Sequence, residues 1–161
     1  HKEVPAKGQI AIFNRSHYED IIAVRVKKIF PDPVWKRRYK HVLDFEAMLA
    51  EEGTVIIKLF LNISKAEQKK RLESRLQDPD KLWKFCMDDL DDRNRWDEFQ
   101  TAYQDLIEKT STPEAPWYII PADRKWYRNL VVARLMVEKL RHLQLSLPTP
   151  NFDPASIIIP D

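Results

Sequence analysis

Three short apolar runs, separated by segments with helical periodicity, constrain the fold more than any other feature of this sequence. The runs are residues 10–13, 54–61 and 117–120, and the middle one is almost wholly apolar, with Lys58 as its charged interruption. Strands that alternate with helices favour a parallel sheet covered by helices on both faces. The sequence therefore predicts an α/β fold in the order strand–helix–helix–strand–helix–helix–strand–helix.

Two capping boxes indicate where helices begin. Glu19 follows Ser16 by three residues, and Glu67 follows Ser64 at the same spacing. At this spacing a serine and an acidic side chain can each accept a hydrogen bond from the other's backbone amide. We therefore expect one helix to begin just after residues 10–13 and another just after residues 54–61.

Two later segments show apolar faces at helical spacing. Residues 88–109 predict one helix, whose face is expected to be core rather than a base-stacking platform, and the last helix has a similar face. The face of the first consists of Trp96, Phe99, Tyr103 and Leu106, and that of the last consists of Trp126, Leu130, Ala133, Val137 and Leu140.

Spaced cations mark the middle of the chain. Arg71 and Arg75 are four residues apart, so on a helix they share one face, and Lys81 and Lys84 follow in a predicted loop. Guanidinium and ammonium groups in this arrangement suit phosphate. The spacing alone leaves two interpretations open, a solvated surface and a polyanion site, and the solvated surface is the simpler.

Composition limits the class of protein. The 161 residues carry a net charge of +2, so no global basic field attracts nucleic acid, and any anion site must be local. Cys86 is the one cysteine, which excludes an internal disulfide and fits a reducing, cytoplasmic compartment. No run is long and apolar enough to span a membrane. We expect neither a nucleic-acid partner nor a membrane partner.

Glycine is scarce, and this scarcity excludes one motif. The chain has two glycines, Gly8 and Gly53. A phosphate-cradling loop of the G-x-x-x-x-G-K type needs two glycines close together before a lysine. That loop is absent from this sequence.

The turn after the first apolar run is the place where an α/β fold puts chemistry, because ligands bind at the carboxyl ends of the strands. Asn14, Arg15 and Glu19 stand there. The alternatives to a functional role are a surface salt bridge for Arg15 and a helix cap for Glu19.

Several motifs together resemble the family-2 polyphosphate kinases, which have a P-loop kinase fold similar to thymidylate kinase. Residues 8–19 look like the family's Walker B region, residues 71–85 with Arg93 and Trp96 look like its lid module, and residues 115–123 look like its last core strand. The resemblance implies a three-layer fold with a parallel sheet and a helical lid.

The resemblance also implies a function. The family moves phosphoryl groups between inorganic polyphosphate and an adenine or guanine nucleotide with Mg²⁺, which requires alignment and positive charge more than covalent help. By resemblance, Arg15 and Glu19 are the catalytic candidates, Glu19 orienting a metal-bound water or a substrate cation, and no residue is assigned as a direct metal ligand. The phosphate-binding candidates are Asn14, Arg15, Arg71, Arg75, Lys81, Lys84 and Arg93.

The sequence departs from the family pattern at Asn14, where an aspartate is usual, at His17 and at Cys86. The larger departure is the missing Walker A segment. We therefore expect the chain to be the carboxyl-terminal part of such an enzyme and a poor catalyst alone. Residues 1–146 would form a partial kinase-like domain and residues 147–161 an extended tail, whose apolar end suggests a homo-oligomer.

Other functions remain open from the sequence. The chain could be a non-catalytic polyanion-binding or interaction module, or a nucleotide kinase with ATP as donor. The residues do not decide between a nucleoside monophosphate and a nucleoside diphosphate as acceptor.

Overall fold

A computed structural model describes residues 2–160 and contains a small sheet with helices around it. In chain order the elements are α1 (Glu19–Val26), α2 (Asp32–Glu51), β1 (Lys58–Asn62), α3 (Lys65–Gln77), the 3-10 helix η1 (Pro79–Lys84), α4 (Asp88–Asn94), α5 (Trp96–Thr110), β2 (Trp117–Pro121), α6 (Lys125–His142) and the 3-10 helix η2 (Pro154–Ser156).

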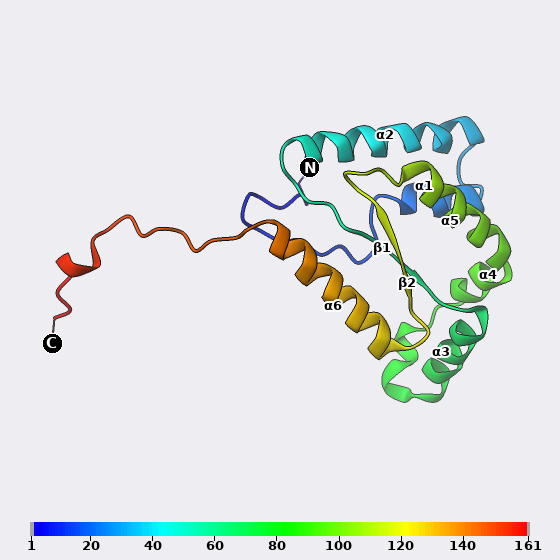
Figure 1. The fold of residues 1–161 in the computed structure, drawn as a ribbon. Helices are drawn as coiled ribbons and strands as arrows, with labels where there is room; N and C mark the ends of the chain where they lie inside the picture. Colours follow the sequence, from blue (N-terminus) through cyan, green and yellow to red (C-terminus); the bar gives the residue numbers. More distant parts are fainter. Residues whose placement is uncertain (1, 161) are drawn as a thin grey trace.

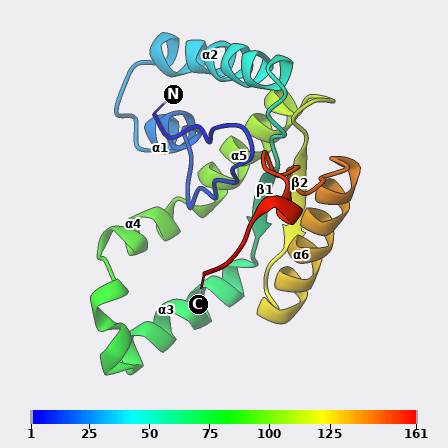
Figure 2. The ribbon, with the colours of Figure 1, turned by 90° about the vertical axis from the view of Figure 1, so that its left-hand side faces the viewer.

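The sheet is parallel, as predicted. β1 pairs with β2, with Lys58 opposite Trp117 and Asn62 opposite Pro121. The chain crosses from one strand to the other through α3, η1, α4 and α5, the kind of long connection that parallel strands need. Figures 1 and 2 both place the sheet between α6 on one side and α5 with α1 on the other. The predicted α/β class is therefore confirmed.

The predicted strand at residues 10–13 is wrong. This segment has no strand geometry, and Ile12 is 84% exposed and Phe13 56% exposed. A strand needs a hydrogen-bonded neighbour, and within residues 2–160 the pairing of the sheet is confined to β1 and β2. The apolar run therefore lies open on the surface.

The core lies around α1, which is buried nearly all round. Ile21 and Ile22 are 0% and 2% exposed, and they join a cluster with Ala102 and Leu106 of α5. Phe99 and Tyr103 pack against the same cluster, whereas Trp96 is half-buried and lies outside it. The aromatic stripe is thus core over its last three residues.

The ends of the helices confirm some of the predicted caps and boundaries and contradict others. The Ser64 hydroxyl accepts a hydrogen bond from the Glu67 amide at 3.1 Å, so this cap is confirmed. α1 has no side-chain cap, so the predicted capping box at Ser16 and Glu19 is wrong. Residues 88–109 form two helices that meet at Arg95 instead of one. The predicted loop after α3 is the 3-10 helix η1.

The last helix and the residues after it are open to solvent. The predicted apolar face of α6 is largely uncovered, with Trp126 63% exposed and Val137 46% exposed. After α6 the chain continues as an extended tail that leaves the body of the molecule (Figure 1). No helix within residues 2–160 has both the length and the apolar character needed to cross a bilayer.

Candidate functional site

The turn before α1 and the first residue of α1 place two of the predicted site residues beside one cavity. Arg15 and Glu19 both line this cavity, which has a volume of about 250 Å³ and is completed by side chains of β1 and α5. Arg15 is exposed and has a left-handed backbone with φ of 72°, an uncommon conformation for a residue with a side chain. The structure therefore brings together the two residues that the sequence singled out as catalytic.

Backbone hydrogen bonds hold this turn. The Glu19 amide donates to the Ser16 carbonyl at 3.0 Å, and the Tyr18 carbonyl accepts from the amides of Ile21 and Ile22. The Ser16 hydroxyl accepts from the Tyr18 amide at 3.4 Å. The helix start is thus fastened by backbone groups and by the buried side chain of Tyr18.

The charges of Arg15 and Glu19 both influence the hydroxyl of Tyr103. Burial raises the pKa of the Tyr103 hydroxyl, the Glu19 carboxylate raises it further, and the Arg15 guanidinium opposes both. Tyr103 lines the same cavity. The cavity wall therefore carries one positive and one negative group over a largely apolar floor.

A buried polar cluster lies directly behind this turn, and the sequence did not reveal it. Lys58 Nζ donates to Glu46 Oε2 at 2.7 Å and to the Thr110 carbonyl at 2.7 Å, and it lies 3.1 Å from the Tyr18 hydroxyl. The Tyr18 hydroxyl donates to Glu46 Oε1 at 2.8 Å. The signal in the sequence was the lysine that interrupts an otherwise apolar strand, because such a charge must find a buried partner.

Arg71 binds backbone rather than solvent. Its Nη2 donates to the carbonyls of Ala122 at 2.6 Å and Asp123 at 3.1 Å, and its Nε donates to Glu67 at 2.8 Å. The Asp123 carboxylate accepts from the Ser64 amide at 2.7 Å, and α6 begins after Arg124 without a side-chain cap. These bonds tie the start of α3 to the turn between β2 and α6.

Arg75 and Arg93 connect α3 with α4. Arg75 Nη1 lies 3.4 Å from the Asp89 carboxylate, with both side chains more than a third exposed. Arg93 Nη1 donates to the Lys65 carbonyl and to the Gln68 side chain, both at 2.8 Å. The two arginines therefore differ, because Arg75 has one long, exposed ion pair whereas Arg93 has two short bonds.

The two lysines of η1 also differ. Lys81 forms an ion pair with Asp78. Lys84 lies over the Trp83 ring at 5.0 Å from its centroid, and within residues 2–160 it has no carboxylate at ion-pair distance. Trp83 is 78% exposed, and its indole nitrogen donates to the Asp80 carbonyl at 3.0 Å. Lys84 is therefore the cation of η1 that is available to a new anion.

The predicted site residues thus form two groups. The five cations that the sequence assigned to a lid lie on the arch formed by α3, η1 and α4, which Figure 2 shows projecting from the rest of the body; they are Arg71, Arg75, Lys81, Lys84 and Arg93. None of them lines the cavity beside Arg15 and Glu19. Asn14 is exposed and precedes this cavity. Within residues 2–160 no cluster of three or more histidine, cysteine or acidic side chains is arranged to hold a metal ion.

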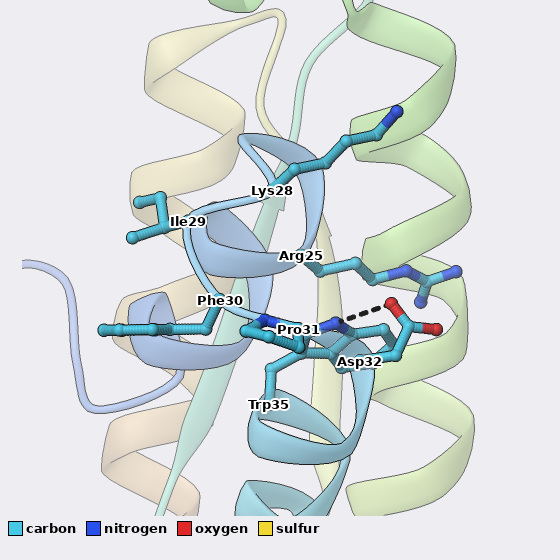
Figure 3. Close-up of a pocket in the computed structure, with 7 residues that line it drawn as sticks. All are labelled: Arg25, Lys28, Ile29, Phe30, Pro31, Asp32 and Trp35. Atoms are coloured by element: carbon cyan, nitrogen blue, oxygen red, sulfur yellow. Dashed lines mark hydrogen bonds between the residues drawn. The ribbon is translucent and has the colours of Figure 1, made fainter.

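A second cavity, of about 420 Å³, lies where α1 leads into α2. Figure 3 shows its side chains diverging: Lys28 and Phe30 point in different directions, and Arg25 points toward Asp32. Arg25 is also held by Asp105 at 2.6 Å. The Trp35 indole nitrogen donates to the same Asp32 carboxylate at 3.2 Å, so these polar groups face one another, and this cavity adds no candidate for the chemistry.

The chain resembles known proteins along nearly its whole length. The sequence model of the family Polyphosphate kinase 2 (PPK2) matches residues 1–147. The AMP/ADP-polyphosphate phosphotransferase of Meiothermus ruber is 53% identical over 99% of this chain and 60% of its own length. The ADP-polyphosphate phosphotransferase of Rhodopseudomonas palustris is 36% identical over 91% of this chain and 55% of its own length.

The fold agrees with that similarity. The crystal structure of polyphosphate kinase 2 from Arthrobacter aurescens TC1 matches with a TM-score of 0.91 and 47% identity, over 96% of this chain and 55% of that one. The chain thus spans 55–60% of the length of these proteins. The predicted P-loop kinase-like fold is confirmed, and the chain belongs to the polyphosphate kinase 2 family.

Proposed function

We propose that the full protein transfers phosphoryl groups between inorganic polyphosphate and a nucleoside mono- or diphosphate. The family match over residues 1–147 and the names of the two relatives support this reaction class. The observation that carries the proposal is that Arg15 and Glu19 meet at one cavity while an arch of cations projects beside the sheet. Phosphoryl transfer depends on such positioning and charge.

In this proposal Arg15 binds a phosphate group at the cavity, with Asn14 beside it. The guanidinium has no hydrogen bond or ion pair within residues 2–160, so no internal partner competes with the ligand. An arginine can hold two phosphate oxygens at once, which fixes orientation as well as charge.

We propose that the lid cations close over the polyphosphate chain. Lys84 is available at once, and Arg75 can exchange its long contact with Asp89 for a phosphate. Lys81 must first leave Asp78. Arg71 contributes charge while it anchors the arch to the turn after β2, and Arg93 contributes charge while it ties α4 to the start of α3.

The carboxylate that lines the cavity is the kind of ligand that Mg²⁺ binds. Mg²⁺ usually keeps several waters and binds through one or two carboxylates together with substrate phosphates. Glu19 is the carboxylate among the residues that line this cavity, so it is the residue that would face the ion or one of its waters. The ion would neutralise phosphate charge during the transfer.

We also propose a division of the chain into two parts, an oligomeric state and a cellular location. Residues 1–146 would belong to the phosphotransferase domain, and residues 147–161 would form a separate tail. The tail residues Ile158 and Ile159 are 90% and 87% exposed, which supports a homo-oligomer that covers them. A cytoplasmic location fits the single cysteine.

The test is an assay of the full protein with polyphosphate, Mg²⁺ and each of AMP, ADP, GMP and GDP. Formation of the next higher nucleotide, lost on chelation of Mg²⁺ and strongly reduced in Arg15→Ala, is the expected result. Transfer from ATP but not from polyphosphate would identify a nucleotide kinase. Polyphosphate binding without any transfer would identify a non-catalytic polyanion-binding module.

A further inference from the structure

We infer that Glu46 and Lys58 are positioning residues for the phosphate-binding turn and act on Arg15 through Tyr18. This inference rests on the proposed function, because it assigns a role to residues behind the same site. None of the three was a candidate from the sequence. All three side chains are buried, and although Tyr18 lines the cavity, its hydroxyl is already bonded to Glu46 and lies 3.1 Å from Lys58, so the three are placed to support a substrate-binding residue.

Tyr18 is where four separate parts of the chain meet. Its hydroxyl bonds to Glu46 of α2 at 2.8 Å and lies 3.1 Å from Lys58 of β1. Its ring packs edge-on against Trp117 of β2, with 5.0 Å between centroids. Lys58 in turn holds the last carbonyl of α5, that of Thr110. A shift of Tyr18 would therefore disturb several elements at once, and this makes its position well defined.

The outer side of the cluster is closed by His17. Its ring stacks on Tyr18 at 4.7 Å between centroids, and its Nε2 lies 3.5 Å from Glu46 Oε1. Glu46 thus receives contacts from two successive residues of the turn. One carboxylate fixes the chain direction immediately after Arg15.

The link to Arg15 is short and covalent. Arg15 is three residues before Tyr18, in a left-handed conformation, and both side chains line the same cavity as Glu19. The amide of Tyr18 is bound by Ser16, and its carbonyl receives the first amides of α1. Tyr18 is therefore the buried end of the turn, and Arg15 is its exposed end.

Stability alone does not explain this polar cluster. A buried ion pair pays a desolvation cost that often equals its attraction, and an apolar replacement of similar volume can be equally stable. What hydrogen bonds add is direction, since they hold the Tyr18 ring and hydroxyl at defined angles. Defined geometry is what a phosphate-binding arginine needs.

The experiment compares Tyr18→Phe with Tyr39→Phe in the full protein. Tyr18→Phe removes only the tethering hydroxyl. Tyr39→Phe is a matched control, because its buried hydroxyl makes no hydrogen bond within residues 2–160. We expect Tyr18→Phe to lower kcat/KM for polyphosphate about tenfold, because the hydrogen bonds of the hydroxyl with Glu46 and Lys58 no longer hold the ring in place. Tyr39→Phe should leave kcat/KM unchanged.

The decisive step repeats Tyr18→Phe in an Arg15→Ala background. If Tyr18 acts through Arg15, its loss should have no further effect there, because contributions that share one route are not additive. An equal tenfold loss in both backgrounds, or no loss in either, would overturn the inference. Glu46→Gln serves as a second variant with the same expected pattern.

The experiment distinguishes a failure of the proposed function from a failure of the positioning role. If Arg15→Ala itself leaves transfer unchanged, Arg15 is not the phosphate ligand, and the proposed function loses that residue. If Arg15→Ala abolishes tight polyphosphate binding but Tyr18→Phe has no effect on binding or turnover, the function stands and the positioning role is wrong. Direct binding of polyphosphate is the readout for variants whose turnover is too slow to measure.

Discussion

Lys58 Nζ lies 2.7 Å from Glu46 Oε2, and the two side chains are 5% and 4% exposed. Burial lowers the pKa of Lys58, and the carboxylate of Glu46 opposes that change. Burial works to raise the pKa of Glu46, but hydrogen bonds from His17, Lys58 and Tyr18 outweigh it and lower that pKa. The pair joins α2 to β1 inside the protein.

Removing one charge of this pair should destabilise the protein strongly. Glu46→Gln leaves Lys58 buried without a carboxylate, so we expect the free energy of unfolding to fall by about 3–5 kcal/mol. Asp44→Asn on the same helix removes an exposed pair with Lys40 and should cost about 0.5 kcal/mol or less. Urea denaturation of the two variants measures both values. Equal denaturation midpoints would show that the buried pair contributes no more to stability than the exposed pair.

The same carboxylate should make stability depend on acid. The pKa of Glu46 lies below its ordinary value of 4.5 in the folded chain, so its contribution is present above pH 4.5 and is lost as the pH falls through the folded pKa. The difference in unfolding free energy between the parent and Glu46→Gln should therefore be large at pH 7 and shrink toward pH 3. A difference that stays constant over this range would contradict the assignment.

The sequence predicted the architecture better than the site, for a physical reason. Strand and helix periodicity report local burial, so β1, β2 and most helices were found. Residues 10–13 are as apolar as a strand but lack a neighbour to pair with, and pairing is not a local property. Glu46 sits on a helix that looks amphipathic, and only the fold shows that it faces Lys58.

The bonding partner of each predicted lid cation also could not be predicted from the local sequence pattern. Arg71 and Arg75 share a helical face in sequence, yet Arg71 is committed to backbone carbonyls and Arg75 to a carboxylate. Which partner each one reaches depends on β2, α4 and the turn before α6. Arg15 and Glu19 could be placed together from the sequence because they are only four residues apart, at the start of one predicted helix.

Lys84 and Lys81 should differ in their effect on polyphosphate binding. Lys84→Ala removes a cation without a carboxylate at ion-pair distance in the described chain, whereas Lys81→Ala also frees Asp78. We expect Lys84→Ala to raise KM for polyphosphate several-fold and Lys81→Ala to raise it less, because a paired cation offers less net charge to a ligand. Steady-state kinetics at two salt concentrations provides the test, and the opposite ranking would reject it.

Arg71→Ala should loosen the arch from the body of the molecule. The change removes hydrogen bonds to the carbonyls of Ala122 and Asp123, and we expect a loss of about 1–3 kcal/mol. Arg71→Lys should recover only part of this, because an ammonium cannot reproduce the fork of the guanidinium. Lys69→Ala, which removes an exposed pair with Glu73 on the same helix, is the matched control.

Hydrogen exchange separates this effect from a general loss of stability. If Arg71 is an anchor, hydrogen exchange in Arg71→Ala should accelerate in α3 and in the turn between β2 and α6. The ratio of protection between the amides of α1 and those of α5 should stay unchanged. Those two helices form the core away from the anchor. Uniform acceleration across all helices would mean that Arg71 supports the whole domain. No change in either region would mean that its charge serves the ligand alone.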